Sequence, residues 1–383
     1  MSTSEAVSAA PAPGRAVDQP KKKRVVSLDA ARAITVALMI FMDHPTIIAS
    51  LPDFLVHPAW HGLRLPDLVF PAFIWIAGVS LAYSVSRKKE LDFRAATWVF
   101  VRRIAVLFAI GLGLNLIKYG LPLRYLGVLQ RIALSLLIAW PFTRSKMRWA
   151  LIGAAVLLVA QGVVLLAVGA PGVAAGDLSI KEANISGHID TVLLGIEHTY
   201  RGLGFDPEGV LGTLSAGAQA LLGLAAGMWL IRFPDSVKRV GQLALTGVAL
   251  AAVGWATAAL FGLPINKQLW TPTFVLVSSG IFTLLLAGMY YVADLKDHDR
   301  YLNWLVPMGR NALLIYVCSS VLVVVARYLT IPTTQMRFFP GAGVALATYL
   351  GEAPASLLLS AAEVAMWFVV AAWLHRRKIY LKL

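Results

Sequence analysis

The sequence predicts an all-α polytopic membrane protein of about ten transmembrane helices with both termini in the cytoplasm. Of its 383 residues, 58% are hydrophobic and 14% are charged, with a mean hydropathy of +0.72. A water-soluble domain of this length does not need so much apolar surface. Stretches near the roughly 20 residues of a spanning helix recur at 28–48, 67–84, 103–118, 127–142, 149–169, 209–231, 240–261, 273–292, 306–328 and 355–374.

Lysine and arginine residues fall mainly on one side of these stretches. With the N-terminus in the cytoplasm, 23 of the 34 lie in cytoplasmic segments and 8 on the opposite side. The positive-inside rule then places both termini in the cytoplasm. The net charge of +14 is therefore a topology signal whose expected partner is anionic membrane lipid rather than nucleic acid.

Two regions follow from composition. Residues 1–24 are rich in alanine, serine and proline and end in a basic run, so we expect a disordered cytoplasmic tail. Residues 25–383 form the transmembrane domain, whose longer connections, at 49–66, 170–208, 262–272 and 329–354, share the non-cytoplasmic face. These connections would have to recognise any polar ligand outside the membrane. The single cysteine, Cys318, excludes an intramolecular disulfide.

Polar side chains in hydrocarbon are costly and mark candidate functional positions. Each candidate also has a structural reading. Asp67 suits the N-cap of the second helix, where a carboxylate meets unpaired N–H groups. Arg131 and Arg310 suit ion pairs between helices, while Asn115 and Asn311 suit interhelical hydrogen bonds.

His57 lies in a short loop between the first two apolar stretches, just ahead of Asp67. An imidazole titrates near neutral pH, so at a membrane face it can act as a general base. A histidine alone in a loop is more often a simple hydrogen-bonding group. The sequence motif around His57 favours the general base over the simple hydrogen-bonding group.

Several ordered stretches carry a family resemblance. They are Ser27-Leu28-Asp29-Ala30-Ala31-Arg32-Ala33-Ile34, His57-Pro58-Ala59-Trp60-His61-Gly62-Leu63, Asp67-Leu68-Val69-Phe70-Pro71, Gly127-Val128-Leu129-Gln130-Arg131, Asp206-Pro207-Glu208-Gly209, Asn266-Lys267-Gln268-Leu269-Trp270 and Asn311 before Leu314-Ile315-Tyr316. Together they resemble the catalytic region of the heparan-α-glucosaminide N-acetyltransferase family, which includes a lysosomal enzyme and bacterial inner-membrane relatives. The resemblance spans nearly the whole chain after residue 25.

The resemblance implies transfer of an acetyl group from cytoplasmic acetyl-CoA to the amine of a terminal glucosamine on the other side of a bacterial inner membrane. The family's active-site histidine corresponds to His57, and Asp67 would orient its ring. A neutral imidazole could take a proton from the amine, or it could carry the acetyl group itself. Asp43 is the third expected catalytic residue, at a position where relatives usually have asparagine, and its carboxylate would add charge near the transferred group. Relatives also imply a homodimer.

Further site residues are assigned by motif or by position. The expected substrate-binding residues are Trp60, Asn115, Arg131, Glu208, Asn266, Lys267 and Asn311. The phosphates of acetyl-CoA require cytoplasmic cations, for which the candidates are Arg32, Arg102, Arg103 and Arg239. Positive-inside charge explains these cations equally well. No metal-ligand cluster, P-loop or dinucleotide motif stands out.

Two other functions remain open. An O-acetyltransferase would keep the donor and use a hydroxyl acceptor on a glycan. An amino-sugar transporter would use the charges at Asp43, Arg131 and Arg310 within the membrane. The absence of an evident internal repeat gives no support to an inverted-repeat transporter.

Overall fold

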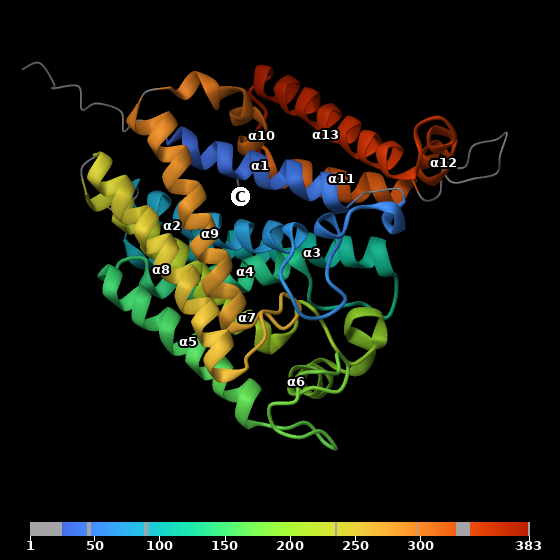
Figure 1. Cartoon of the computed structure of the whole chain (residues 1–383). Helices are drawn as coiled ribbons and strands as arrows, with labels where there is room; N and C mark the ends of the chain where they lie inside the picture. Colours follow the sequence, from blue (N-terminus) through green and yellow to red (C-terminus); the bar gives the residue numbers. More distant parts are fainter. Residues whose placement is uncertain are drawn as a thin grey trace, which may run out of the picture.

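The protein is an all-helical bundle in the part of the chain that the computed structural model describes, which is residues 25–43, 47–87, 90, 92–233, 236–296, 298–326 and 338–381. Within these residues the structure has no named strand, only an isolated bridge between Gly62 and Asn266. The expected tail at 1–24 lies outside the described residues. Figure 1 shows the helices packed side by side in one bundle, with their axes at several different angles.

The helices follow the apolar stretches of the sequence. The bundle contains α1 (Val26–Asp43), α2 (Val69–Arg87), α3 (Phe93–Tyr119), α4 (Val128–Ala139), α5 (Met147–Ala167), α7 (Val210–Arg232), α8 (Val237–Phe261), α9 (Pro272–Tyr290), α11 (Ala312–Ala326) and α13 (Glu352–Arg376). Three shorter helices are α6 (Ile185–Leu194), α10 (Val306–Arg310) and α12 (Phe338–Leu350). Side-chain caps begin several of them; for example, Asp92 accepts from two backbone N–H groups at the start of α3.

All ten predicted apolar stretches contain helices, and this confirms the polytopic all-α class. Seven helical segments of the described chain are long and apolar enough to span a membrane by length and composition, and an eighth is the bent pair formed by 303–310 and 312–326. The two helices of this pair meet at 67°. The predicted stretches around α1 and α4 fall short of that test, so the count of ten spans stays a prediction.

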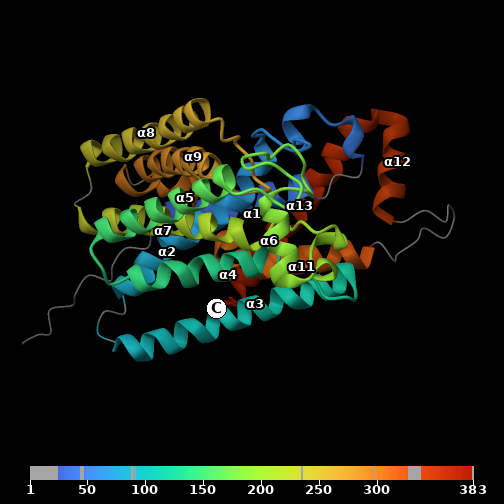
Figure 2. The same cartoon turned by 90° about the horizontal axis from the view of Figure 1, so that it is seen from below.

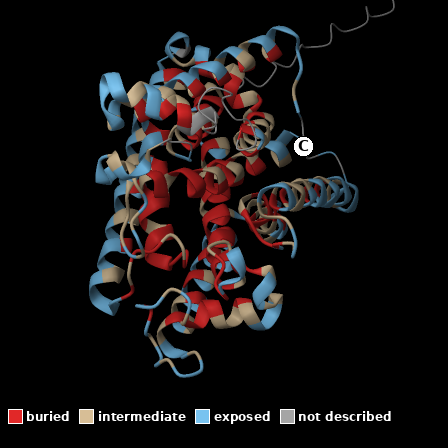
Figure 3. Cartoon of the chain, turned by 90° about the vertical axis from the view of Figure 1, so that its right-hand side faces the viewer, coloured by how far each residue is buried: buried red, intermediate tan, exposed pale blue. Residues whose placement is uncertain are grey.

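The centre of the bundle is the contact between α2 and α7. Gly78 and Gly223 let the two backbones touch, because a Cβ atom on either glycine would lie 2.1 Å from a carbonyl oxygen of the facing helix. Small residues at such crossings are typical of membrane helices, where close backbone approach increases van der Waals contact. Helices α5 and α9 pack against α7, and α8 packs outside α9. In Figure 3 the buried residues concentrate in the inner helices, and the exposed ones cover the outside.

The longer connections meet at one end of the bundle. Residues 47–68, 168–209 and 262–271 come together beside α6 in Figures 1 and 2, at the end where α1 and α3 finish and α2 begins. The opposite end carries the starts of α1 and α3 and the end of α2. The 168–209 connection is not simple loop, since it contains α6 and two short 3₁₀ turns. The region expected as a connection at 329–354 likewise contains α12.

Candidate functional site

The loop that carries His57 is fixed by the connection between α8 and α9. The Gly62 N–H donates to the Ile265 carbonyl at 2.9 Å, and the Asn266 side-chain amide donates to the Trp60 carbonyl at 2.9 Å. Asn266 is fully buried, and its own oxygen accepts from the Leu269 N–H. The described hydrogen bonds of Asn266, a predicted substrate-binding residue, therefore position this loop and the connection that holds it.

His57 and Asp67 form a hydrogen-bonded pair. Nδ1 of His57 lies 2.6 Å from Oδ1 of Asp67, a carboxylate that is 1% exposed. The other oxygen, Oδ2, accepts from the Arg64 N–H at 2.9 Å, so Asp67 also caps the short turn before α2. Asp67 is thus the third residue of this turn rather than its N-cap, which is Arg64, and its role in orienting the ring stays a prediction. Because Nδ1 faces the carboxylate, Nε2 is the ring nitrogen left for chemistry.

A cavity of about 410 Å³, here called the histidine cavity, lies in front of this pair. Its walls include five charged or amide groups from the predicted site together with aromatic and basic neighbours, namely Asp43, His57, Asn115, Glu208, Lys267, Lys118, Tyr119, Arg124, Tyr200 and Tyr316. A smaller outer cavity of about 190 Å³ adjoins it and shares His57, Glu208 and Lys267. Trp60 and Asp67 also line the outer cavity.

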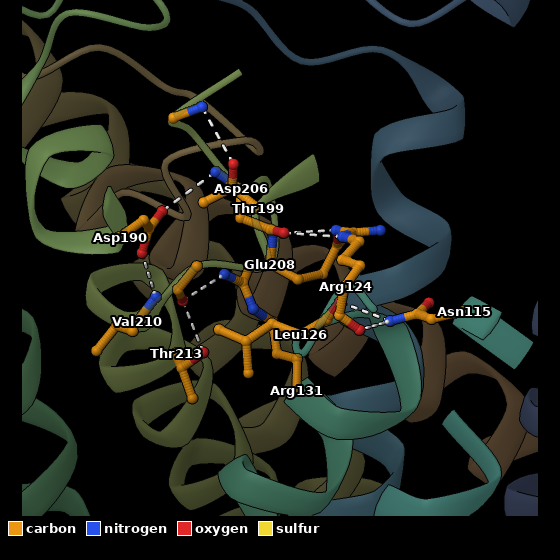
Figure 4. A network of polar contacts seen from close by, with 12 residues as sticks. Asn115, Arg124, Leu126, Arg131, Asp190, Thr199, Asp206, Glu208, Val210 and Thr213 are labelled. Atoms are coloured by element: carbon orange, nitrogen blue, oxygen red, sulfur yellow. Dashed lines mark hydrogen bonds and ion pairs between the residues drawn. The ribbon is translucent and has the colours of Figure 1, made fainter. Parts of the chain in front are cut away.

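A buried network of charges holds Glu208 at the wall (Figure 4). Arg124 donates to both oxygens of Asp206, at 2.8 and 2.5 Å, and pairs with Glu208 as well. Asp190 accepts from the Val210 N–H at 2.8 Å and from the Asp206 N–H at 3.2 Å, which ties α6 to the start of α7. Such charge-assisted contacts fix the geometry of a buried carboxylate.

The pKa values of two carboxyl groups in this network are shifted in opposite directions. Burial disfavours charge on Glu208, but the fields of Arg124, Arg131 and Lys267 outweigh it and hold the pKa of this carboxyl below its usual value. Glu208 is therefore anionic at neutral pH and can bind a cationic group. Burial raises the pKa of Asp190 to about 6, although the two backbone hydrogen bonds oppose the shift.

A second and larger cavity, of about 690 Å³, opens at the other end of the bundle and is here called the basic cavity. Four arginines line it: Arg32, Arg87, Arg103 and Arg310. The one acidic residue among its described lining residues is Asp29, which pairs with Arg32 at 2.9 Å. The basic and histidine cavities share three wall residues, which are Phe73, Val128 and Tyr316.

Two of the four predicted donor cations line the basic cavity. Arg32 and Arg103 face it, while Arg102 is exposed on α3 and is not among the residues that line it. Arg239 is buried elsewhere, with its guanidinium over the rings of Trp229 and Tyr290. The sequence reasoning missed Arg87 and Arg310, although Arg310 already stood out as a charge inside an apolar stretch.

The remaining predicted substrate residues differ in position. Asn115 lines the histidine cavity but donates both amide hydrogens to the carbonyls of Arg124 and Leu126. Arg131 is buried, donates to the Gly209 carbonyl and lies over the ring of Trp270, and it is not among the described residues that line the basic, histidine or outer cavity. Asn311 is buried at the bend between α10 and α11. The Trp60 indole N–H donates to the Leu178 carbonyl at 2.6 Å.

The sequence did not predict that Tyr119, Arg124 and Tyr200 line the histidine cavity. Arg124 lies beside the rings of Tyr119 and Tyr200, with its guanidinium carbon 5.5 and 4.9 Å from their centroids. These two tyrosines border the histidine cavity from different connections, so their proximity follows from the tertiary fold. The signal in the sequence was the single arginine in the short connection before α4, opposite two acidic residues of the Asp206-Pro207-Glu208 motif.

The fold and site define a polytopic α-helical membrane protein with a histidine–aspartate pair at one end of the bundle and a basic cavity at the other. Residues 24–179 match the family model described as heparan-alpha-glucosaminide N-acetyltransferase, catalytic. The chain is 29% identical over 362 residues to the human heparan-alpha-glucosaminide N-acetyltransferase, covering 78% of this chain and 53% of that protein. The mouse protein of the same name is 25% identical over 421 residues, covering 94% and 60%.

The chain is thus similar to the heparan-α-glucosaminide N-acetyltransferases, through residues 24–179 for the family model and at 25–29% identity for the two relatives. It spans between half and two thirds of the length of these two curated relatives.

Proposed function

We propose that this protein is a transmembrane N-acetyltransferase of a bacterial inner membrane. It takes an acetyl group from acetyl-CoA at the cytoplasmic face and transfers it to the amine of a terminal glucosamine or related amino sugar at the opposite face. His57 serves as general base or acetyl carrier, and Asp67 orients its ring. The family names of the two relatives support the reaction class.

The observation that carries this proposal is the pair of cavities that meet at Phe73, Val128 and Tyr316. Coenzyme A is a polyanion that cannot cross hydrocarbon unaided. The basic cavity offers arginines for its phosphates at one end of the bundle, and the histidine cavity offers the base near the other. A slender pantetheine arm that passed the shared wall would bring the thioester to His57 without moving the nucleotide.

The acceptor would enter from the side of the longer connections. Its amine is largely ammonium at neutral pH, and anionic Glu208, at the walls of both the histidine and the outer cavity, suits that cation. Nε2 of His57 takes a proton from nitrogen, which then attacks the carbonyl carbon as the carbon–sulfur bond breaks and the thiolate leaves. In the acetyl-carrier route, Nε2 attacks the carbonyl carbon and the thiolate leaves; the deprotonated amine then attacks the same carbon, and the bond between this carbon and Nε2 breaks.

The test uses purified protein in proteoliposomes of known orientation. Labelled acetyl-CoA is supplied on the face that carries the N-terminus, with glucosamine on the other, and product is measured in each compartment. We expect labelled amide only on the glucosamine side. Product only on the acetyl-CoA side would refute the transmembrane reaction while leaving acetyl transfer intact. Uptake of glucosamine without acetyl-CoA would favour a transporter, and a base-labile product would indicate an ester from a hydroxyl acceptor.

A further inference from the structure

The last described residues of the chain fold back toward the basic cavity. Helix α13 ends in a tight turn in which the Ile379 N–H donates to the Leu374 carbonyl at 2.9 Å and the Lys378 N–H donates to the His375 carbonyl at 3.0 Å. Lys378 has a φ of 59°, in the left-handed region that usually takes glycine at this position. The turn reverses the chain, so that Leu381 lines the basic cavity.

This turn brings Tyr380 onto Arg310. The guanidinium carbon of Arg310 lies 3.6 Å from the centroid of the Tyr380 ring, the shortest such distance among the described cation–π pairs. The Tyr380 hydroxyl is 3.3 Å from Nδ1 of His375 on the preceding helix. The ring is thus anchored at both ends, by the turn and by this contact.

Gly309, the residue before Arg310, is held against α1. Gly309 packs so closely on that helix that a Cβ atom would lie 1.9 Å from the Asp29 carbonyl oxygen. Arg310 comes directly after this contact, at the bend between α10 and α11. Its backbone position relative to α1 and the basic cavity is therefore fixed.

The N–H donors of Arg310 have no assigned acceptor. Within the described residues, the structure records no hydrogen bond or ion pair for this side chain, whereas Arg32 in the same cavity pairs with Asp29 and donates to Ser80. An arginine stacked flat on an aromatic ring keeps the edge of its guanidinium available for bidentate binding. Phosphate oxygens are the natural partners of that edge.

We infer that the C-terminal segment 377–381 is part of the donor site, in which Arg310 binds a phosphate of coenzyme A and Tyr380 is its positioning residue. This inference rests on the proposed function. Among the described residues of this segment Leu381 alone lines the cavity, so the segment borders the cavity instead of filling it. The site recognises the phosphorylated nucleotide end of the donor and has no contact with the acceptor.

The experiment measures binding of coenzyme A and of adenosine 3′,5′-bisphosphate to the purified full chain by calorimetry. Steady-state kinetics give the KM for acetyl-CoA and the KM for the acceptor. Tyr380→Leu removes the ring, whereas Tyr380→Phe keeps it and loses the hydroxyl. Tyr349→Leu, at an 87% exposed tyrosine of α12, is the matched control. We expect Tyr380→Leu and Arg310→Gln each to weaken coenzyme A binding about threefold to tenfold. The double variant should be no worse than Arg310→Gln alone.

Rescue by Tyr380→Phe, an unchanged acceptor KM and a normal control would support the positioning role. Wild-type affinity in Tyr380→Leu would overturn it, and tighter binding would show instead that the segment blocks entry. Both results leave the proposed function standing. Failure of the wild-type chain to bind coenzyme A would refute the proposed function and this inference with it.

Discussion

His57 and Lys267 approach the same oxygen of one buried carboxylate. Oδ1 of Asp67 lies 2.6 Å from Nδ1 of the histidine and 3.8 Å from Nζ of the lysine. The histidine and the lysine come from connections about 200 residues apart in sequence, and the isolated bridge between Gly62 and Asn266 joins these connections. The charge of Asp67 is thus balanced before any substrate binds, and the ring of His57 is held in one orientation.

The first prediction concerns His57. His57→Ala should lower kcat by a factor on the order of 10² or more, since this is typical for loss of a general base. Folding and coenzyme A binding should persist, because the His57 side chain is 44% exposed and contributes little to the core. Steady-state kinetics and a thermal melt measure the two effects. Activity within a few-fold of wild type would remove His57 from the mechanism.

Asp67→Asn separates orientation from capping. Asparagine caps a helix nearly as well as aspartate, so the melting temperature should change little. The rate should fall, but less than in His57→Ala, because the ring loses its anionic partner while the base remains. A large loss of stability with a normal rate in the folded fraction would assign Asp67 to capping alone.

The second prediction compares two neighbouring arginines of α3. Arg103 lines the basic cavity, while Arg102 is exposed and does not. Arg103→Gln should raise the KM for acetyl-CoA about tenfold, the scale of one hydrogen bond to a charged group. Arg102→Gln should leave this KM within about twofold, because an exposed charge contributes little. Equal effects of the two changes would contradict the placement of the donor in this cavity.

The third prediction concerns the packing of α2 on α7. Gly223→Ala would force a Cβ atom to 2.1 Å from the Trp75 carbonyl oxygen, so the helices must separate. Overpacking of this kind costs about 1 to 3 kcal/mol. Gly113→Ala on α3 is the control, since no atom lies within 4 Å of its added Cβ. Thermal melts in one detergent should show a lower melting temperature for the first variant and no decrease for the second.

The fourth prediction is a pH dependence at Asp190. Burial raises the pKa of this carboxyl to about 6 in the folded protein, from about 3.9 in an unfolded chain. The folded state therefore holds the proton more tightly, and this contribution to the free energy of unfolding is present below about pH 4 and lost as pH rises through about 6. The loss amounts to about 1 to 3 kcal/mol.

Asp190→Asn removes this titration. The melting temperature of wild type minus that of the variant, measured at each pH, therefore isolates the contribution of Asp190. This difference should decrease as pH rises from 4.5, because wild type loses stability relative to the variant, and it should level off above pH 7. Asp177, which is exposed, provides an Asp177→Asn control. A difference that stays constant with pH would contradict a raised pKa at Asp190.

Hydropathy predicted where the helices lie in the sequence, but it did not predict where a helix bends. The stretch at 306–328 reads as one span, yet it bends at Asn311, where Pro307 and Gly309 precede the break. Mean composition over a window does not report such a bend, because apolar residues continue on both sides of it. The helices α6 and α12 were missed for another reason, since both are apolar but shorter than a membrane span.

The site was predictable where a motif was local. His57 and Asp67 are ten residues apart, and their pairing matches the expected orientation of the ring. Asn266 and Arg131 also stood out, but their partners are backbone carbonyls of remote segments. No pattern in one sequence specifies that a polar side chain will bind backbone rather than face a cavity. Their expected contact with substrate stays a prediction.

Close backbone contacts fix two pairs of helices in the bundle. Glycines join α2 to α7 on one side, and Gly309 joins α10 to α1 on the other. Sliding within either pair would require carbonyl groups to pass through one another's van der Waals radii, so we expect each pair to move as a unit. The basic cavity is lined from both units, which places it on the seam between them. A ligand as wide as a nucleotide would therefore be admitted by a small opening of this seam, with the helix interiors unchanged.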